Sequence, residues 1–171
     1  MNPMSPQETK KIEEMNVKEI AEYLGIPVWL VQSLMCNWIE STPLTGASSC
    51  IATDEFNTWS PVRIAILNSL PLNAIERPID LRVYPVNAKR LLEFLSSVPN
   101  IYTCFVGHPA TANVISKYIN VKCVRGEYRY NGEIIVSFVL RNRPQSGAEV
   151  NVTEDDLLGY IVYPTPILDN A

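Results

Sequence analysis

From residue 62 onward, short apolar segments alternate with segments of helical period, and this alternation restricts the possible folds more than any other feature. Residues 62–67 (VRIAIL) are typical of a buried strand, which Asn68 ends. Residues 81–84, 101–106 and 159–163 also have strand character. Because alternating strands and helices pack as layers, the sequence predicts an α/β fold, with helices packed on a mixed sheet of about five strands.

Capping and turn residues set the expected limits of the other elements. One helix is expected from Asn87 to about residue 97, and another from Pro109 to about residue 119. The dipeptide Asn131-Gly132 favours a tight turn with positive φ at both central positions. The sequence therefore predicts a β-hairpin formed by residues 122–130 and 133–140.

The first 40 residues are predicted to form a helical extension. Asn16, followed by Glu19 three residues later, has the pattern of an N-cap, and Gly25 ends this first helix. A second helix is expected over residues 28–40. The expected division of the chain is a helical extension (residues 1–40), a linker rich in Ser, Thr, Pro and Gly (residues 41–61) and an α/β domain (residues 62–171).

Helix, glycine turn and helix form the outline of a helix-turn-helix motif, which raises the question of DNA binding. The predicted second helix contains neither Lys nor Arg, although a groove-reading helix needs donors to bases and phosphates. Residues 1–61 hold three Lys against eight Asp or Glu, so the phosphate backbone repels this part of the chain. DNA is therefore an unlikely partner, and a docking or oligomerisation element is the favoured interpretation.

Composition indicates a soluble protein of the cytoplasm. Of the 171 residues, 47% are apolar, yet no apolar run approaches the roughly 20 residues that cross a bilayer, and the N-terminus lacks a signal-peptide pattern. With one histidine and four cysteines without CxxC spacing, a zinc site is not expected. No cofactor or membrane partner is expected. The four cysteines are predicted to be reduced core residues, namely Cys36, Cys50, Cys104 and Cys123.

His108 is the side chain with the clearest chemical potential. It follows Gly107 at the end of a predicted strand and precedes Pro109 at the first helical position. This places an imidazole beside the free N–H groups of a helix start, at Ala110 and Thr111, where a phosphate binds readily. An imidazole held protonated by that anion acts as a general acid. The alternative is that His108 only caps its helix.

Other polar side chains are expected near the same rim. Ligands of open α/β sheets bind beyond the carboxyl ends of the strands, where Asn68 and Asn73 flank the end of the first strand. Residues 121–143 hold five basic side chains against two acidic ones. Arg141 and Arg143 close the second strand of the predicted hairpin and are suited to hold a phosphate. The alternatives are ordinary turn asparagines and a solvated strand end.

Four segments together resemble the viral type III anti-CRISPR ring nucleases, a small family found in crenarchaeal viruses and some bacteria. Their order and intervals match the family, and GHxAT is the most specific piece. The resemblance covers about residues 62–168. The segments are residues 64–73 (IAILNSLPLN), 83–92 (VYPVNAKRLL), 107–116 (GHPATANVIS) and 138–147 (FVLRNRPQSG).

The resemblance implies a metal-independent homodimer that binds cyclic tetra-adenylate across its two-fold axis. Cleavage to linear di-adenylate with a 2′,3′-cyclic phosphate then switches off type III CRISPR signalling, in the host cytoplasm if the protein is viral. The family's histidine and arginine fall on His108 and Arg143, which implies a general acid and a residue that stabilises the phosphorane. The implied ligand-binding residues are Asn68, Ser69, Leu70, Pro71, Asn73, Gly107, Ala110, Thr111, Arg141 and Ser146.

The chain departs from the family pattern at two positions. Ser146 stands where many relatives carry a glutamate, and Pro71 stands where some carry a serine. Both positions lie at the ligand in the family, so their loss implies slow cleavage, or binding without turnover. A slow enzyme is the favoured expectation. The alternatives are a sponge that sequesters the cyclic nucleotide and a transcription regulator that senses a ligand.

Overall fold

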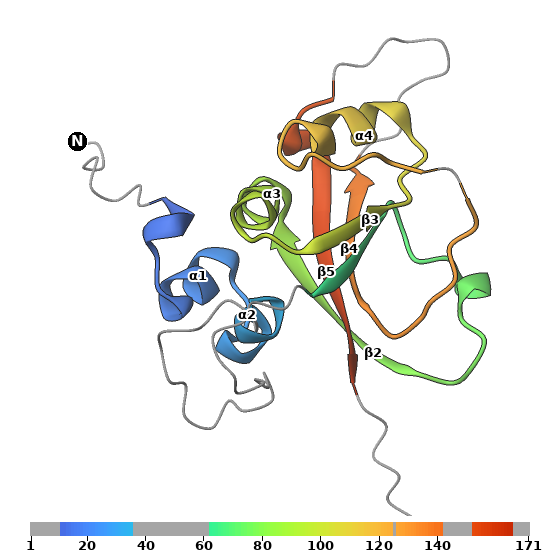
Figure 1. The fold of residues 1–171 in the computed structure, drawn as a ribbon, viewed down its shortest axis with the longest axis horizontal. Helices are drawn as coiled ribbons and strands as arrows, with labels where there is room; N and C mark the ends of the chain where they lie inside the picture. Colours follow the sequence, from blue (N-terminus) through green and yellow to red (C-terminus); the bar gives the residue numbers. More distant parts are fainter. Residues whose placement is uncertain (1–10, 36–61, 125, 142–151, 166–171) are drawn as a thin grey trace, which may run out of the picture. The chain divides into compact units, whose positions relative to one another are not determined.

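The computed structural model describes residues 11–35, 62–124, 126–141 and 152–165 (Figure 1). Contacts along the chain divide it into two compact units, residues 1–60 and residues 61–171.

The described part of the first unit holds a short 3-10 turn and two helices. They are η2 (Ile12–Glu14), α1 (Val17–Leu24) and α2 (Val28–Leu34). The side chain of Asn16 accepts a hydrogen bond from the Glu19 N–H at 2.8 Å, and the Glu19 carboxylate accepts one from the Asn16 N–H at 3.0 Å. Gly25, with φ at 73°, ends α1 in the left-handed region. The predicted cap and end of α1 are confirmed. Residues 36–61 lie outside the described residues, and with them the predicted continuation of the second helix to residue 40 and the predicted linker.

The second unit is built on a mixed five-stranded sheet, which confirms the predicted α/β fold. The strands lie in the order β2-β5-β4-β1-β3. The central β1 pairs in parallel with β3 and β4, whereas β5 pairs antiparallel with both β4 and β2. The strands are β1 (Arg63–Leu67), β2 (Asp80–Asn87), β3 (Ile101–Cys104), β4 (Ile134–Leu140) and β5 (Leu157–Thr165).

Helices cover one face of this sheet. The helices are α3 (Ala88–Ser97), which Asn87 caps by accepting a hydrogen bond from the Arg90 N–H at 3.0 Å, and α4 (Pro109–Ser116). Side chains alternate across a strand, so Ile64, Ile66 and Phe138 project to the same face, and each is at most 1% exposed. The apolar sides of the two helices supply the covering layer of this core.

Irregular segments cover the opposite face. Ala65, Leu67, Ile135 and Val162 form a buried cluster there with Ala74 and Tyr128, which come from the loops at residues 68–79 and 121–133. The segment at 122–130 was predicted to be a strand of a hairpin, and this prediction is wrong. Both edges of β4 are occupied, by β1 and β5, so no edge is left for the preceding segment. Gly132 does adopt the positive φ expected of the turn, at 84°.

The edge strand β2 is longer than predicted. We expected a strand over residues 81–84, but β2 continues through Pro85 to Asn87 and pairs with β5 along its whole length. Proline lacks an N–H and is tolerated on an edge strand because one side of that strand makes no ladder hydrogen bonds. The edge position of β2 therefore explains why Pro85 does not end it.

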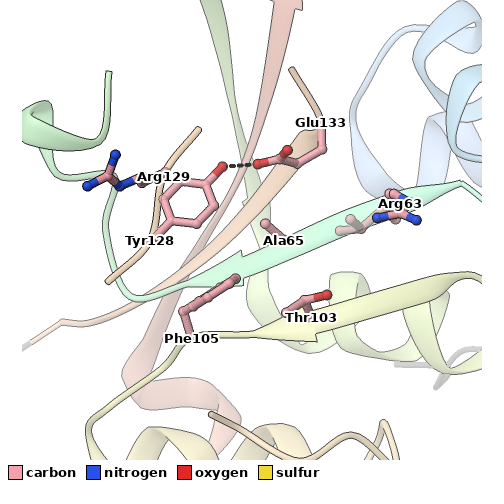
Figure 2. A pocket seen from close by; sticks show the side chains of 8 residues that line it. Arg63, Ala65, Thr103, Phe105, Tyr128, Arg129 and Glu133 are labelled. Carbon is pink, nitrogen blue, oxygen red and sulfur yellow. Dashed lines mark hydrogen bonds between the residues drawn. The ribbon is translucent and has the colours of Figure 1, made fainter. Parts of the chain in front are cut away.

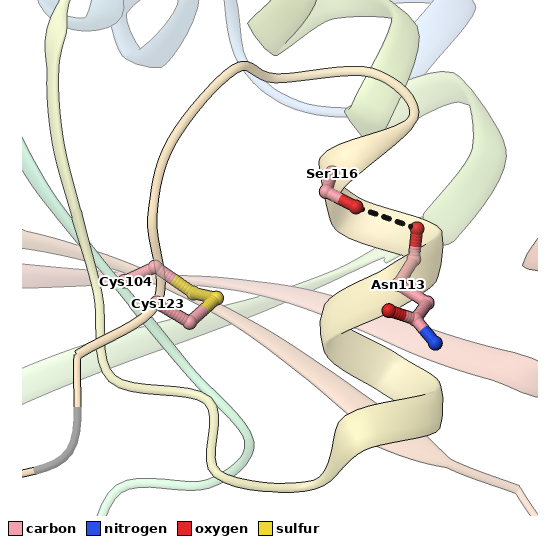
Figure 3. Close-up of a disulfide and its surroundings, with 4 residues drawn as sticks. All are labelled: Cys104, Asn113, Ser116 and Cys123. Carbon is pink, nitrogen blue, oxygen red and sulfur yellow. Dashed lines mark hydrogen bonds between the residues drawn. A yellow bond between two sulfur atoms is a disulfide. The ribbon is translucent and has the colours of Figure 1, made fainter.

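Cys104 and Cys123 form a disulfide, so the prediction that they are reduced thiols is wrong (Figure 3). An isolated parallel bridge pairs these two residues and brings their Cα atoms to 4.5 Å from each other. This close approach results from the path of the chain after α4, which the spacing of the cysteines does not reveal. Cys36 and Cys50 lie outside the described residues.

Candidate active site

The carboxyl ends of three parallel strands meet at one edge of the sheet. β1 ends there at Leu67, β3 at Cys104 and β4 at Leu140, because β1 is parallel to both of its neighbours. The loops that follow these strands carry the residues predicted to form a site. Crevices beyond the carboxyl ends of strands are the usual binding places in open α/β sheets.

After β3 the chain runs through Gly107 to His108, which is the N-cap residue of α4. Pro109 holds the first helical position, where its missing N–H has no consequence. Gly107 is exposed, and a Cβ atom built there meets no other atom within 4 Å, so space is open beside it. The predicted strand–turn–helix connection is therefore present.

The imidazole of His108 does not cap the helix. Although His108 occupies the N-cap position, its side chain makes no capping hydrogen bond. The Nδ1 atom is buried and has no hydrogen-bond partner. Thr111, in the first turn of α4, is 0% exposed, and its Oγ1 also lacks a partner. Two buried polar atoms without partners within one helical turn indicate a place that a ligand or water completes.

The start of α4 adds donors to these side chains. The first backbone bond of the helix runs from the Ala112 N–H to the His108 carbonyl at 2.9 Å. The N–H groups of Ala110 and Thr111 precede that bond, and first-turn N–H groups have no acceptor within their own helix. Together with the positive end of the helix dipole they favour an anion. The arrangement is thus suited to bind a phosphate beside an imidazole.

The loop after β1 brings only part of the predicted residues to this edge. Asn68 follows the strand directly, and its carbonyl accepts a hydrogen bond from Ser137 Oγ at 2.6 Å. Ser69 and Pro71 are exposed, whereas Leu70 packs against the buried cluster on the loop-covered face. Asn73 lies farther on, in the 3-10 turn η5 (Leu72–Ala74).

Arg141 lies at the same edge, immediately after β4. Its backbone N–H donates to the Asp156 carbonyl at 2.8 Å, in the 3-10 turn η6 (Glu154–Asp156), and its side chain is exposed. Arg143 and Ser146 lie outside the described residues. The structure therefore places Arg141 at the edge that carries Asn68 and His108, and the roles of Arg143 and Ser146 stay predictions.

A pocket that sequence analysis missed lies on the loop-covered face (Figure 2). Arg63 and Glu133 line it near the amino-terminal ends of β1 and β4. The ring of Phe105 meets that of Tyr128 edge to face, with centroids 5.1 Å apart, and the Tyr128 hydroxyl donates to Glu133. Burial, followed by this hydrogen bond and the negative charge of Glu133, raises the pKa of Tyr128.

This pocket does not fit a cyclic oligonucleotide. Its volume is about 130 Å³, well below the roughly 300 Å³ at which pockets for drug-sized ligands begin. Among its lining residues, Phe105 and Tyr128 are the aromatic ones, and aromatic residues at these positions are equally typical of a core. The edge with His108 is therefore the better candidate for the active site.

No group of three or more His, Cys, Asp or Glu side chains is placed to hold a metal ion in the described part of the chain. Among the helices that the structure describes, none combines the length and the apolar character needed to cross a membrane.

These observations define an α/β protein with a mixed five-stranded sheet and a histidine beside a helix start at its edge. No protein-family model matches the sequence, and no curated protein matches it. Among solved structures, the chain is similar to B116 of Sulfolobus turreted icosahedral virus. The two share 14% sequence identity with a TM-score of 0.46, over 59% of this chain and 98% of that one.

Proposed function

We propose that this protein is a metal-independent ring nuclease that cleaves cyclic tetra-adenylate to linear di-adenylate ending in a 2′,3′-cyclic phosphate. The placement of His108 carries this proposal, because its buried, unpartnered Nδ1 lies within one turn of the equally unpartnered Thr111 Oγ1 at the start of α4. The four segments that resemble the ring nucleases support the choice of substrate, and one of them, residues 107–116, contains this helix start.

The proposed reaction needs an acid and donors to a phosphate. The ribose 2′-hydroxyl attacks the adjacent 3′-phosphorus, forming the new P–O2′ bond, and the P–O5′ bond on the opposite side breaks. The proton of the 2′-hydroxyl passes to solvent, and His108 gives a proton to the departing 5′-oxygen. The N–H groups of Ala110 and Thr111 stabilise the negative charge that grows on the non-bridging oxygens. Two such cleavages convert one ring into two di-adenylates.

A two-fold homodimer gives this reaction its symmetry. A ring of four equivalent nucleotides has two-fold symmetry, so each protomer of a two-fold dimer presents one His108 to one half of the ring. In this proposal Arg143, two residues beyond Arg141, holds the reacting phosphate through its guanidinium.

A sponge without turnover is the second candidate. The substitutions at Ser146 and Pro71 favour it, because the family carries ligand-contacting side chains at these positions. Pro71 is exposed and directly precedes η5. A sponge and an enzyme bind the same ring and differ only in whether product forms.

A single-turnover assay with labelled cyclic tetra-adenylate in EDTA tests the proposal. His108→Ala should slow product formation by about 10²–10⁴-fold, the usual contribution of a general acid, while the ring still binds. Asn113→Ala is the matched control, since Asn113 is exposed on the same helix and should leave the rate unchanged. Equal rates for His108→Ala and wild type would exclude His108 as the acid. Tight binding without product would identify a sponge, and absence of both would refute the proposal.

A further inference from the structure

The disulfide closes a covalent loop that contains His108 and the start of α4. Cys104 is the last residue of β3, and Cys123 follows 19 residues later (Figure 3). The residues between them include Gly107, His108 and the whole of α4. Any change in this bond therefore acts on the segment that holds the proposed acid.

The segment that returns from α4 to β3 has few other attachments. Among the described residues, its backbone bonds to β3 through the Val124 N–H, which donates to the Cys104 carbonyl at 2.8 Å. Lys122 is exposed and Val124 is 42% exposed, so burial fixes this segment weakly. Between the buried Ile119 and Tyr128, the disulfide and this hydrogen bond are therefore the links from the described residues of the segment to β3.

The same segment supports the loop before His108. It continues to Tyr128, whose ring packs against Phe105 on the other side of the disulfide. Phe105 follows Cys104 directly, and its N–H donates to the Ile66 carbonyl at 2.8 Å. The start of the loop that leads to His108 is therefore held by β1 on one side and by the ring of Tyr128 on the other.

The two cysteine residues differ in exposure. Cys104 is 0% exposed, whereas Cys123 is partly exposed and follows the exposed Lys122. An incoming thiolate therefore reaches the sulfur of Cys123 before that of Cys104. Such an asymmetry gives the exchange reaction a defined first step.

We propose that the Cys104–Cys123 disulfide is a redox-sensitive switch, and that its reduction by a dithiol loosens the loop that carries His108. One thiolate of the dithiol attacks Cys123 Sγ, forming a mixed disulfide and releasing Cys104 as a thiolate that takes up a proton. The second thiol of the reductant then attacks the reductant's first sulfur, which is bonded to Cys123. An intramolecular disulfide forms in the reductant, and Cys123 is released as a thiol. The protein gains two electrons and two protons, and the dithiol becomes a disulfide.

The first test determines the thiol state. In the full-length C36S/C50S variant, Cys104 and Cys123 are the two cysteines left. Alkylation followed by intact mass measurement should add no alkyl group before treatment with dithiothreitol and two after it. Two reactive thiols before treatment, in protein purified in air, would overturn the proposal.

The second test measures mobility, independently of activity. Amide hydrogen exchange of peptides within residues 105–124 should become at least about fivefold faster after reduction, while exchange in β4 stays unchanged. The C104S/C123S variant should match reduced wild type and not respond to dithiothreitol. If that variant fails to fold, reduced wild type alone supplies the comparison. Equal exchange in the oxidised and reduced forms would overturn the proposal.

The third test measures binding of cyclic tetra-adenylate, and this arm rests on the proposed function. The reduced C36S/C50S protein should bind the ring at least about fivefold more weakly than the oxidised protein. Equal affinity would show that the disulfide is a structural bond and not a switch. If neither form binds the ring, the proposed function fails, and the exchange measurement alone decides whether the disulfide controls the loop.

Discussion

Replacement of Gly159 by alanine places a methyl group where β5 meets the backbone of β2 and the start of α3. Gly159 pairs with Val86 of β2 and with Phe138 of β4. A Cβ atom built on Gly159 lies 2.8 Å from the Val86 carbonyl oxygen and 3.1 Å from the Ala88 Cα. Both neighbours are backbone atoms, so the methyl group fits only if β2 or the first turn of α3 moves.

The expected cost follows from two opposing effects. Overpacking of this kind destabilises proteins by roughly 1–3 kcal/mol. The loss of glycine's freedom in the unfolded chain stabilises by about 0.4–1 kcal/mol, because φ of Gly159 lies outside the left-handed region. The middle of each range gives a net loss of roughly 1.3 kcal/mol in the free energy of unfolding. For a chain of this size the melting temperature should fall by roughly 2–8 °C.

Urea unfolding followed by far-UV circular dichroism measures this change, and two other glycines serve as controls. Gly126 has open space around its Cα and no positive φ, so Gly126→Ala should stay within about 0.5 kcal/mol of wild type. Gly132 has equally open space but a φ of 84°, so Gly132→Ala should lose roughly 1 kcal/mol through backbone strain alone. Wild-type stability in Gly159→Ala would refute the close approach of β5 to Val86 and Ala88.

Two further predictions concern single side chains. Asn87→Ala removes the N-cap of α3 and should lower the free energy of unfolding by about 1 kcal/mol in urea titrations, whereas Asn87→Asp should retain most of it. Tyr102 donates to the carbonyls of Leu95 and Val98 at 2.9 and 2.6 Å, and burial raises its pKa above the ordinary value of 10. Because the folded state favours the protonated phenol, stability should decline as the pH rises above about 10, and Tyr102→Phe should flatten this decline.

Local signals in the sequence were sufficient to predict several helix caps and turns. Asn16 caps α1, Asn87 caps α3, and Gly132 adopts a positive φ, since each depends on residues within a few positions of it. The prediction of a hairpin was wrong because the partner of a strand is decided by segments far along the chain. β1 and β5 take both edges of β4, which no pattern in residues 122–140 indicates.

The features of the candidate site also divide into those that local sequence predicts and those that depend on long-range packing. The order Gly-His-Pro predicts a helix that starts at Pro109, directly after His108, and the structure has it. That the Thr111 hydroxyl is completely buried without a partner depends on packing around α4 and could not be predicted. The Cys104–Cys123 bond likewise requires the chain to return beside β3 after the helix, a long-range event.

The position of β2 in the sheet has a consequence for synthesis of the chain. In the described part of the protein, β2 pairs with β5 alone, and the bonded residues Asp80 and Thr165 are 85 positions apart. The strands β3, β1 and β4 can assemble before residue 157 leaves the ribosome. In contrast, β2 can pair only after β5 has been synthesised. A premature stop before β5 would therefore remove two strands from the sheet, one of which, β2, precedes β3 in the chain.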